Sequence, residues 1–243
     1  MCGIAGFCIH KDEKVNAKKL SLALLAEIEV RGEDATGAAW VQTNKETKKA
    51  SIVVSKAPVA ARDFAQYIDK MPVGVKRAVL HTRYATQGSP GNNLNNHPIV
   101  SGRVVGVHNG HLANDRQVFD YFRADRRGEV DSEAAFALLD RTVYRPIEVL
   151  QSLKGRAALA WFDARDKRDL HLARVDGSPL AVGATHAGSL VFASTMPLLV
   201  AAMERVNISL SWVEDIEAMT YMRVRNGEIV ELENIGTSVK AIA

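Results

Sequence analysis

Helical hydrophobic patterns occur in several parts of the chain. Residues 17–30 are apolar around most of a helical circumference and contain no helix breaker, which predicts a helix buried on more than one side. Asp131-Ser132-Glu133 is a strong helix start with acidic residues in its first turn. Apolar residues follow it at the spacing i, i+3, i+4 and i+8, which predicts one core-facing stripe: Ala135, Leu138, Leu139 and Val143. Shorter helices are expected at 60–68, 114–122 and 197–203.

Short apolar runs between polar turns predict strands. They lie at 4–7, 38–41, 51–54, 77–80, 103–107, 157–162, 170–173, 180–182, 190–193, 221–225 and 228–232. Asn226-Gly227, between the last two runs, is typical of a type I′ hairpin. The sequence contains no internal repeat, low-complexity tract or linker, so the pattern predicts a single domain with two layers of strand and flanking helices.

Two of the predicted strands end in polar residues. The strand at 77–80 leads into a loop that begins with His81–Gly88, and the strand at 103–107 ends at His108-Asn109-Gly110. Functional sites are often built on polar loops that a buried strand holds in place. These two strand ends are therefore the first candidates for a site.

Composition indicates an ordinary globular protein. A chain of 243 residues with 47% hydrophobic content can bury a sizeable core, and a net charge of +3 offers no electrostatic footprint for nucleic acid or a membrane. Arg123, Arg126 and Arg127 are interpreted as a solvated surface cluster. The N-terminal apolar run is short and has no leading basic region, and no apolar run approaches the ~18 residues of a membrane span. The sequence therefore predicts neither a secretory signal nor a membrane span.

The chain has two cysteines, Cys2 and Cys8. On one strand they would lie about 20 Å apart, too far for a disulfide, so free thiols and a reducing, cytoplasmic setting are expected. Removal of Met1 would give Cys2 a free α-amine, which titrates near ~7.7–8.0 and could accept the thiol proton directly or through one water. The alternative is that Cys2 is a small apolar residue at a frayed end. The choice depends on the motifs downstream.

Six motifs follow one another in a specific order. They are Cys2-Gly3-Ile4-Ala5-Gly6, Arg31-Gly32-x-Asp34-x-x-Gly37, His81-Thr82-Arg83-Tyr84-Ala85-Thr86-x-Gly88, Asn96-His97-Pro98, Val107-His108-Asn109-Gly110-x-x-x-Asn114 and Asp131-Ser132-Glu133. Together they resemble the glutaminase domain of class II glutamine amidotransferases, within the N-terminal-nucleophile (Ntn) hydrolases. The resemblance implies one α+β domain over residues 2–243, a four-layer αββα sandwich of two mostly antiparallel sheets flanked by helices. It also implies hydrolysis of the side-chain amide of glutamine to glutamate and ammonia.

The resemblance gives each motif residue a role. Cys2 would attack the amide carbon, and the Asn109 side-chain amide and the Gly110 N–H would form the oxyanion hole, each donor worth about 3–4 kcal/mol. The alternative for Asn109-Gly110 is a hairpin turn. Arg83 suits the α-carboxylate of glutamine, because a guanidinium can bind two oxygens at once, and Asp131 suits the α-ammonium.

Further residues match the surroundings of the substrate in the family. Thr86, Gln87 and His97 match the loop and shell around glutamine, and Arg31 and Asp34 are implied to brace the nucleophile strand. Tyr84 stands where many relatives have tryptophan, and Gln87 stands where some have histidine.

Four histidines within a short stretch raise the alternative of a metal site: His81, His97, His108 and His111. No pair has the i, i+4 spacing of a metal-binding helix, and no cysteine or carboxylate completes a familiar ligand set. We expect no metal and no cofactor, and interpret the histidines as mainly structural. Cys8 is interpreted as a core residue.

Three hypotheses of function follow. The first is a glutaminase unit that supplies ammonia to a separate synthase, because nothing before Ala243 offers an acceptor site. The second is a stand-alone glutaminase or another N-terminal-cysteine amidase, and the third is a catalytically silent regulatory subunit. The pair Arg83 and Asp131 favours an amino-acid substrate, and intact Cys2, Asn109 and Gly110 argue against a silent subunit.

Overall fold

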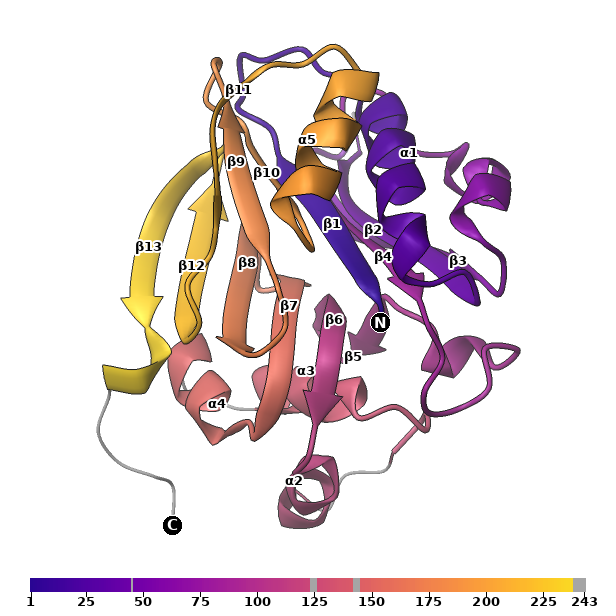
Figure 1. The fold of residues 1–243 in the computed structure, drawn as a ribbon, viewed down its shortest axis with the longest axis vertical. Coiled ribbons are helices and arrows are strands. Elements are labelled where there is room, and N and C mark those ends of the chain that lie inside the picture. The colour runs from indigo at the N-terminus through magenta and orange to yellow at the C-terminus, as the bar shows by residue number, and fades with distance from the viewer. Residues whose placement is uncertain (45, 123–125, 142–144, 238–243) are drawn as a thin grey trace.

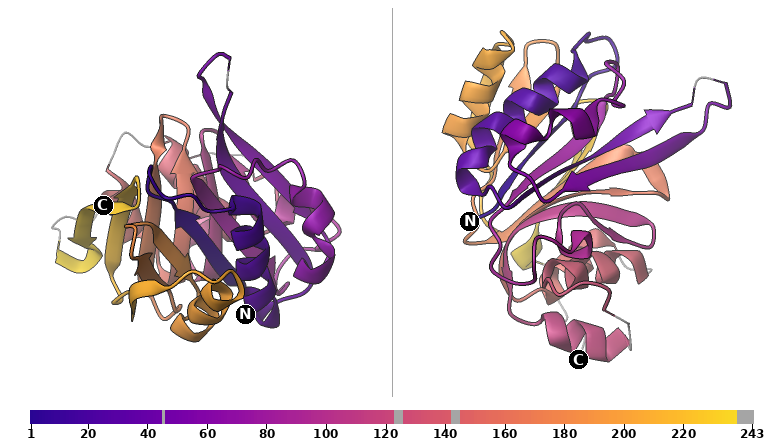
Figure 2. Two further views of the ribbon diagram at one scale, coloured as in Figure 1. Left: turned by 90° about the horizontal axis from the view of Figure 1, so that it is seen from above. Right: turned by 90° about the vertical axis from the view of Figure 1, so that its right-hand side faces the viewer.

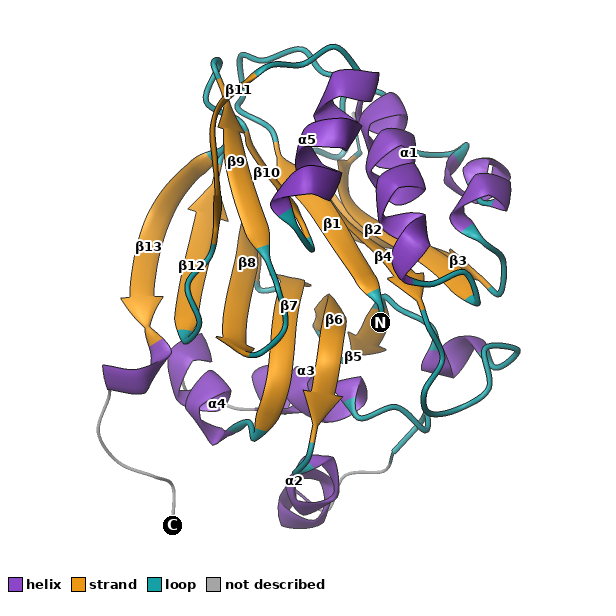
Figure 3. Cartoon of the chain, in the orientation of Figure 1, coloured by secondary structure: helices purple, strands orange, loops and turns teal. Residues whose placement is uncertain are grey.

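The computed structural model describes residues 1–243 except 45, 123–125, 142–144 and 238–243. In the described part of the chain, two antiparallel sheets pack face to face, and helices cover the outer face of each (Figures 1 and 3). This arrangement is the predicted αββα sandwich. The N-terminus lies at one edge of the molecule, between the two layers of strands (Figure 2, right).

The first sheet contains the N-terminal strand in its middle. Its strand order is β11 (Leu210–Asp215), β9 (Ala181–Thr185), β10 (Leu190–Ala193), β1 (Gly3–Cys8), β4 (Arg77–Arg83), β2 (Ala35–Thr43) and β3 (Ala50–Ala57). Helices α1 (Ala17–Ile28) and α5 (Met196–Arg205) pack side by side on its outer face (Figure 1). The central place of β1 holds the start of the chain on both sides.

The second sheet carries the other candidate strand. Its order is β13 (Glu228–Asn234), β12 (Thr220–Arg225), β8 (Asp166–Asp176), β7 (Gly155–Asp163), β6 (Val104–Leu112) and β5 (Ile99–Ser101). The helices on this side are α2 (Asp115–Phe122), α3 (Ser132–Arg141) and α4 (Pro146–Ser152). The hairpin predicted between β12 and β13 is confirmed, with Asn226 and Gly227 both at positive φ.

Buried side chains form a core in each of the three spaces between layers. The core between the sheets includes Ile4, Val79, Val107, Leu172 and Phe192, all fully buried. A second core lies under α1 and α5, and a third lies between the second sheet and α3 and α4. α1 contributes Leu20, Leu24 and Leu25 to the core under it, in agreement with the helix predicted there.

Several predicted boundaries are wrong. β4 continues through His81 to Arg83 and β6 continues through Asn109 to Leu112, because neighbouring strands extend both ladders beyond the apolar residues. The helix predicted at 60–68 is a pair of 3₁₀ turns at 61–63 and 65–68. β5, β11 and α4 were not predicted, and Val143 lies outside the described residues.

Among the described residues, no helix is both long enough and apolar enough to span a membrane.

Candidate active site

Three of the predicted site residues face the space between the sheets. Side chains alternate along a strand, so residues an even number of positions apart share a face. The core between the sheets contains Ile4 of β1, Val79 of β4 and Val107 of β6. Each lies an even number of positions from a predicted site residue: Cys2, Arg83 and Asn109, respectively. β6 also contacts β1 and β4 directly, so the strands that carry the three side chains meet across the sandwich.

The Cys2 thiol is held at the start of β1. It donates a hydrogen bond to the Tyr84 carbonyl at 3.6 Å, and the Cys2 carbonyl accepts one from Arg31 Nε at 2.8 Å. Burial raises the pKa of this thiol, while the Tyr84 hydrogen bond and the positive charge of Arg83 act in the opposite direction and Asp131 adds to the rise. Arg83 and Asp131 are therefore close enough to influence the sulfur electrostatically.

Asp34 ties the end of β4 to the segment before β2. Its Oδ2 accepts from the Ala85 N–H at 2.7 Å, and its own N–H donates to the Arg83 carbonyl at 2.9 Å. Gly32 allows this approach, because a Cβ there would lie 2.3 Å from the Arg83 carbonyl carbon. The Arg31–Asp34 segment thus holds both the nucleophile residue and the backbone to which its thiol bonds.

Ser194 is a supporting residue to which the sequence assigned no role. Its Oγ accepts from the Ile4 N–H at 2.9 Å and donates to the Ile4 carbonyl at 3.3 Å. It follows directly after β10, whose ladder with β1 begins at Ala5 and Ala193. The serine hydroxyl therefore continues the ladder toward Cys2. The sequence does place a polar residue directly after a buried strand here, but that pattern did not define its role.

Asn109 and Gly110 lie within a strand rather than in a turn. They pair with Ala158 and Ala157 of β7, so the hairpin-turn alternative is wrong. Asn109 is 3% exposed, and its Nδ2 has no hydrogen-bond partner among the described residues. Gly110 has φ of 153°, and a Cβ there would lie 1.9 Å from the Arg156 carbonyl oxygen. The geometry at position 110 requires glycine and leaves a buried amide donor beside it.

Arg83 organises the loop that follows β4. It is 3% exposed, and its guanidinium donates to Asn96 Oδ1 at 2.8 Å and to the carbonyls of Gly88, at 2.8 Å, and Gln87. The side chains of Thr86 and Gln87 are exposed. The guanidinium thus holds the loop, and the side chain leaves β4 on the face that is turned toward the second sheet.

Asp131 is fixed immediately before α3. Its Oδ2 accepts from the Leu112 N–H at 2.6 Å, and its Oδ1 accepts from the Ser132 N–H at 2.9 Å. His111 Nδ1 lies 3.5 Å from Oδ2. The carboxylate therefore has a defined orientation beside Leu112, which is the last residue of β6 and lies three positions after Asn109.

Two buried histidines pack against each other beside these groups. The rings of His81 and His97 stack with centroids 4.1 Å apart. Burial lowers the pKa of His81 to about 3 and the pKa of His97 well below its usual value, so both rings are neutral at pH 7. In the described part of the chain, no group of three or more histidine, cysteine or carboxylate side chains could hold a metal ion.

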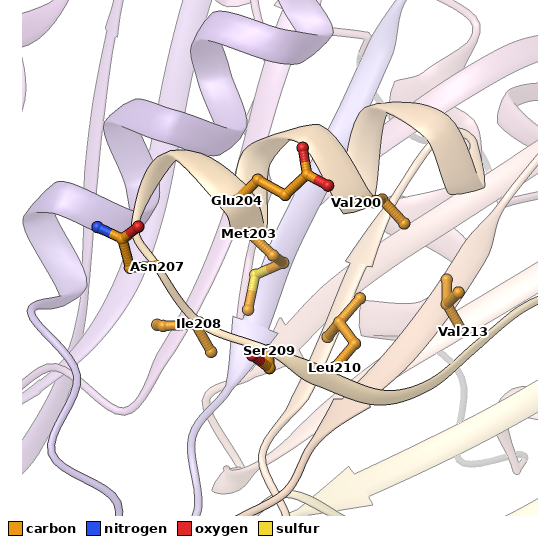
Figure 4. A pocket seen from close by; sticks show the side chains of 8 residues that line it. All are labelled: Val200, Met203, Glu204, Asn207, Ile208, Ser209, Leu210 and Val213. Atoms are coloured by element: carbon orange, nitrogen blue, oxygen red, sulfur yellow. The ribbon is translucent and has the colours of Figure 1, made fainter.

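A hollow beside α5 lies elsewhere on the molecule (Figure 4). It is lined from α5, β11 and the segment between them, by Val200, Met203, Glu204, Asn207, Ile208, Ser209, Leu210 and Val213. No predicted site residue lines it, and its only charged lining residue is Glu204.

Comparison with known proteins identifies the family. The family model described as "Glutamine amidotransferase domain" matches residues 81–201. The glutamine–fructose-6-phosphate aminotransferases (isomerizing) of Geobacillus kaustophilus and Bacillus subtilis are 30% and 31% identical over 209 and 219 residues, or 82% and 86% of this chain. The chain carries a class II glutamine amidotransferase domain. It spans about a third of the length of these curated relatives, 33% and 34%.

The amidotransferase domain also resembles a solved structure. The glutamine phosphoribosylpyrophosphate amidotransferase from B. subtilis, complexed with ADP and GMP, superimposes with a TM-score of 0.77 at 19% identity. The match covers 98% of this chain and 50% of that one. It shows the fold of the amidotransferase domain, a sandwich of two antiparallel sheets flanked by helices.

Proposed function

We propose that this amidotransferase domain hydrolyses the side-chain amide of L-glutamine to glutamate and ammonia, with Cys2 as the nucleophile. The observation that carries the proposal is the buried Asn109 Nδ2, which has no hydrogen-bond partner among the described residues. Leaving such a donor unsatisfied costs about 1–3 kcal/mol. An oxyanion formed above Cys2 would supply the missing acceptor, and Gly110 would offer its N–H beside it.

The reaction begins with a proton transfer from Cys2. Burial raises the pKa of the thiol, so thiolate formation needs a base close by. We propose that Met1, which is 68% exposed, is removed and that the freed amine of Cys2 is this base. While the peptide bond to Met1 is intact, the Cys2 nitrogen is an amide and cannot accept the proton.

The chemistry then passes through two oxyanions. The thiolate adds to the amide carbon of glutamine, and Asn109 and Gly110 stabilise the negative oxygen. The carbon–nitrogen bond breaks, and the leaving nitrogen takes the proton from the Cys2 ammonium and departs as ammonia. Water, deprotonated by the same amine, attacks the γ-glutamyl thioester through a second oxyanion, and glutamate leaves as the thiol is restored.

Arg83 and Asp131 support glutamine over other amides. They are an oppositely charged pair, and both act electrostatically on the Cys2 thiol. An α-carboxylate and an α-ammonium on one substrate match this pair, with Thr86, Gln87 and His97 around it. An N-terminal-cysteine amidase for an uncharged amide would have no use for both charges.

The acceptor of the ammonia is proposed to be a separate synthase. The names of the curated relatives include fructose-6-phosphate, and these names describe those longer proteins. For this chain we propose a reducing, cytoplasmic setting.

We propose that the synthase docks at residues 84–93. Tyr84 supports this surface, because the residue is 55% exposed while its carbonyl accepts a hydrogen bond from the Cys2 thiol. A partner that moved Tyr84 would therefore act directly on the nucleophile.

Ammonia release by the purified protein tests the proposal. We expect release from L-glutamine and none from L-asparagine, and intact-mass analysis of the active protein should show Met1 absent. Full activity with Met1 retained would contradict the mechanism. Wild-type activity that is high, unregulated and without a co-purifying acceptor enzyme would favour a stand-alone glutaminase.

A further inference from the structure

His81 joins the two sheets at the active site. It lies on β4 in the first sheet and is 0% exposed. Its Nε2 is 3.2 Å from the carbonyl oxygen of His108, which lies on β6 in the second sheet. In the β1–β4 ladder, His81 stands opposite Ile4, two residues after Cys2, and His108 directly precedes Asn109. One hydrogen bond thus connects the strand beside the nucleophile to the strand that carries the oxyanion donor.

β6 needs such support at this point. Among the described residues, β5 pairs only with Val104, Val105 and Gly106, so the free side of β6 begins just before His108. On its other side the ladder with β7 continues to Leu112. The His108 ring is also anchored, since its Nδ1 lies 2.8 Å from Ser132 Oγ. His81 therefore holds β6 at His108, on the side of the strand that β5 no longer covers.

The chemistry of the bond defines the tautomer of His81. A carbonyl oxygen only accepts, so Nε2 must carry the proton. The ring stacks on His97, and its Nδ1 has no hydrogen-bond partner among the described residues. His81 is then a neutral ring with one N–H, and that N–H is used to hold the His108 carbonyl.

We propose that His81 is a positioning residue that sets the Asn109 amide against the Cys2 sulfur through its hydrogen bond to the His108 carbonyl. The proposal rests on the glutaminase function proposed above. A displacement of about 1 Å at a catalytic group can cost about 100-fold in rate, and loss of one oxyanion donor costs about 100–1,000-fold. Loss of the His81 bond should therefore lower kcat and leave KM for glutamine nearly unchanged, because glutamine is held by other residues.

Two substitutions at this position separate positioning from packing. In His81→Gln the side-chain amide nitrogen can reach the place of Nε2, whereas in His81→Asn it reaches only the place of Nδ1. We expect His81→Asn to lower kcat about 10- to 100-fold with KM within about 3-fold, and His81→Gln to stay within about 3-fold of wild type. Equal kcat values in the two variants, whether both high or both low, would overturn the proposal.

His171→Gln is the matched control. His171 is also buried, stacks on Trp161 at 4.9 Å and bonds the Tyr221 hydroxyl at 2.9 Å, but it lies on β8 away from the site. We expect a lower unfolding temperature and an unchanged kcat. A loss of kcat as large as in His81→Asn would show that general loosening of the second sheet explains the effect.

An activity-independent measurement is the ¹⁵N NMR spectrum of the His81 ring in the wild-type protein. We expect the Nε2–H tautomer with no protonation between pH 8 and pH 5. An Nδ1–H tautomer, or a ring that titrates in that range, would overturn the inference even if the variants failed to fold. If the wild-type protein released no ammonia from glutamine, the proposed function would fail, and the ring measurement would still decide the role of His81.

Discussion

The two cysteines show how position, more than residue type, separates chemistry from packing. Both lie on the inner face of the first sheet, but Cys8 is fully enclosed in the core between the sheets, where its sulfur accepts the Gly227 N–H at 3.2 Å. Cys2 stands one residue before β1. Its thiol donates a hydrogen bond to the Tyr84 carbonyl, and the charges of Arg83 and Asp131 act on it. Only Cys2 can combine a thiol with a free amine.

Arg83→Lys tests the substrate carboxylate at the residue scale. Lysine keeps the charge but loses the planar group that donates to the loop at three points and still has N–H groups at Nε and Nη1 for a carboxylate. We expect KM for glutamine to rise at least about 10-fold in saturation kinetics. Arg62→Lys is the control, because Arg62 is an exposed arginine paired with Glu29 and Glu33. An unchanged KM in Arg83→Lys would place the carboxylate elsewhere.

Asp131→Asn tests the substrate ammonium. A variant with asparagine there cannot pair with a positive charge, so it should lose the preference for glutamine over glutaramic acid, the same amide without its ammonium. We expect the ratio of kcat/KM values for the two substrates to fall about 10-fold or more. The measurement compares both substrates in both proteins. A ratio equal to that of wild type would contradict the role of Asp131.

At the scale of elements, two serines hold the two ends of β1. Ser194 Oγ accepts the Ile4 N–H at the end near Cys2, and Ser189 Oγ accepts the His10 N–H at 2.8 Å at the far end. Both serines flank β10. The nucleophile strand is thus fixed at each end by the same kind of bond from one neighbour.

Replacing each serine by alanine separates stability from catalysis. Each change leaves a backbone N–H without its acceptor and should lower the free energy of unfolding by about 1–3 kcal/mol in urea titrations. Only Ser194→Ala should also lower kcat, by about 10-fold, because only it loosens the end of β1 beside Cys2. An equal kcat in the two variants would show that the Ser194 bond does not position the nucleophile.

The boundaries of β4 and β6 show what a hydrophobic pattern can and cannot predict. The apolar runs located both strands, but the pattern ends at Leu80 and Val107, while the ladders continue into the polar site residues. β11 has no buried residue, so its sequence carried no periodic signal. β5 and α4 are too short for periodicity to be recognised.

At the scale of the whole molecule, the site forms where two sheets meet. Resemblance to the family indicated Cys2, Arg83, Asn109 and Asp131 from the sequence. The bond from His81 to the His108 carbonyl could not be predicted, because it depends on how two separate sheets are placed against each other, and no strand pairing links them. The Ser194 contact could not be predicted either, because it joins two residues that are 190 positions apart in the sequence.

Burial of neutral histidines makes stability depend on pH. The pKa of His81 is about 3 in the folded protein and ~6.5 in an unfolded chain, so the unfolded chain takes up the proton first as the pH falls. The contribution of the neutral His81 to the free energy of unfolding is complete above pH ~6.5 and is lost as the pH falls toward the folded pKa. We expect this residue to lower the free energy of unfolding by about 3 kcal/mol between pH 6.5 and pH 4.

Urea unfolding at pH 7, 5.5 and 4 measures this dependence. His81→Gln should give a flatter dependence than wild type, whereas His186→Gln, which replaces an exposed histidine, should leave it unchanged. Parallel curves for wild type and His81→Gln would contradict this, because they would show that His81 takes up its proton over the same pH range in the folded protein as in the unfolded chain.

The central claim is that Cys2 is the nucleophile of a glutaminase. The most direct measurement is ammonia release from L-glutamine by wild type, Cys2→Ala and Cys8→Ala, with the unfolding free energy of each protein determined in parallel. The account predicts no release above background by Cys2→Ala with its fold intact. It predicts release by Cys8→Ala, with a loss of stability of a few kcal/mol at most, about what removal of a buried sulfur costs. Equal residual activity in the two variants, or wild-type release no higher than that of Cys2→Ala, would contradict it.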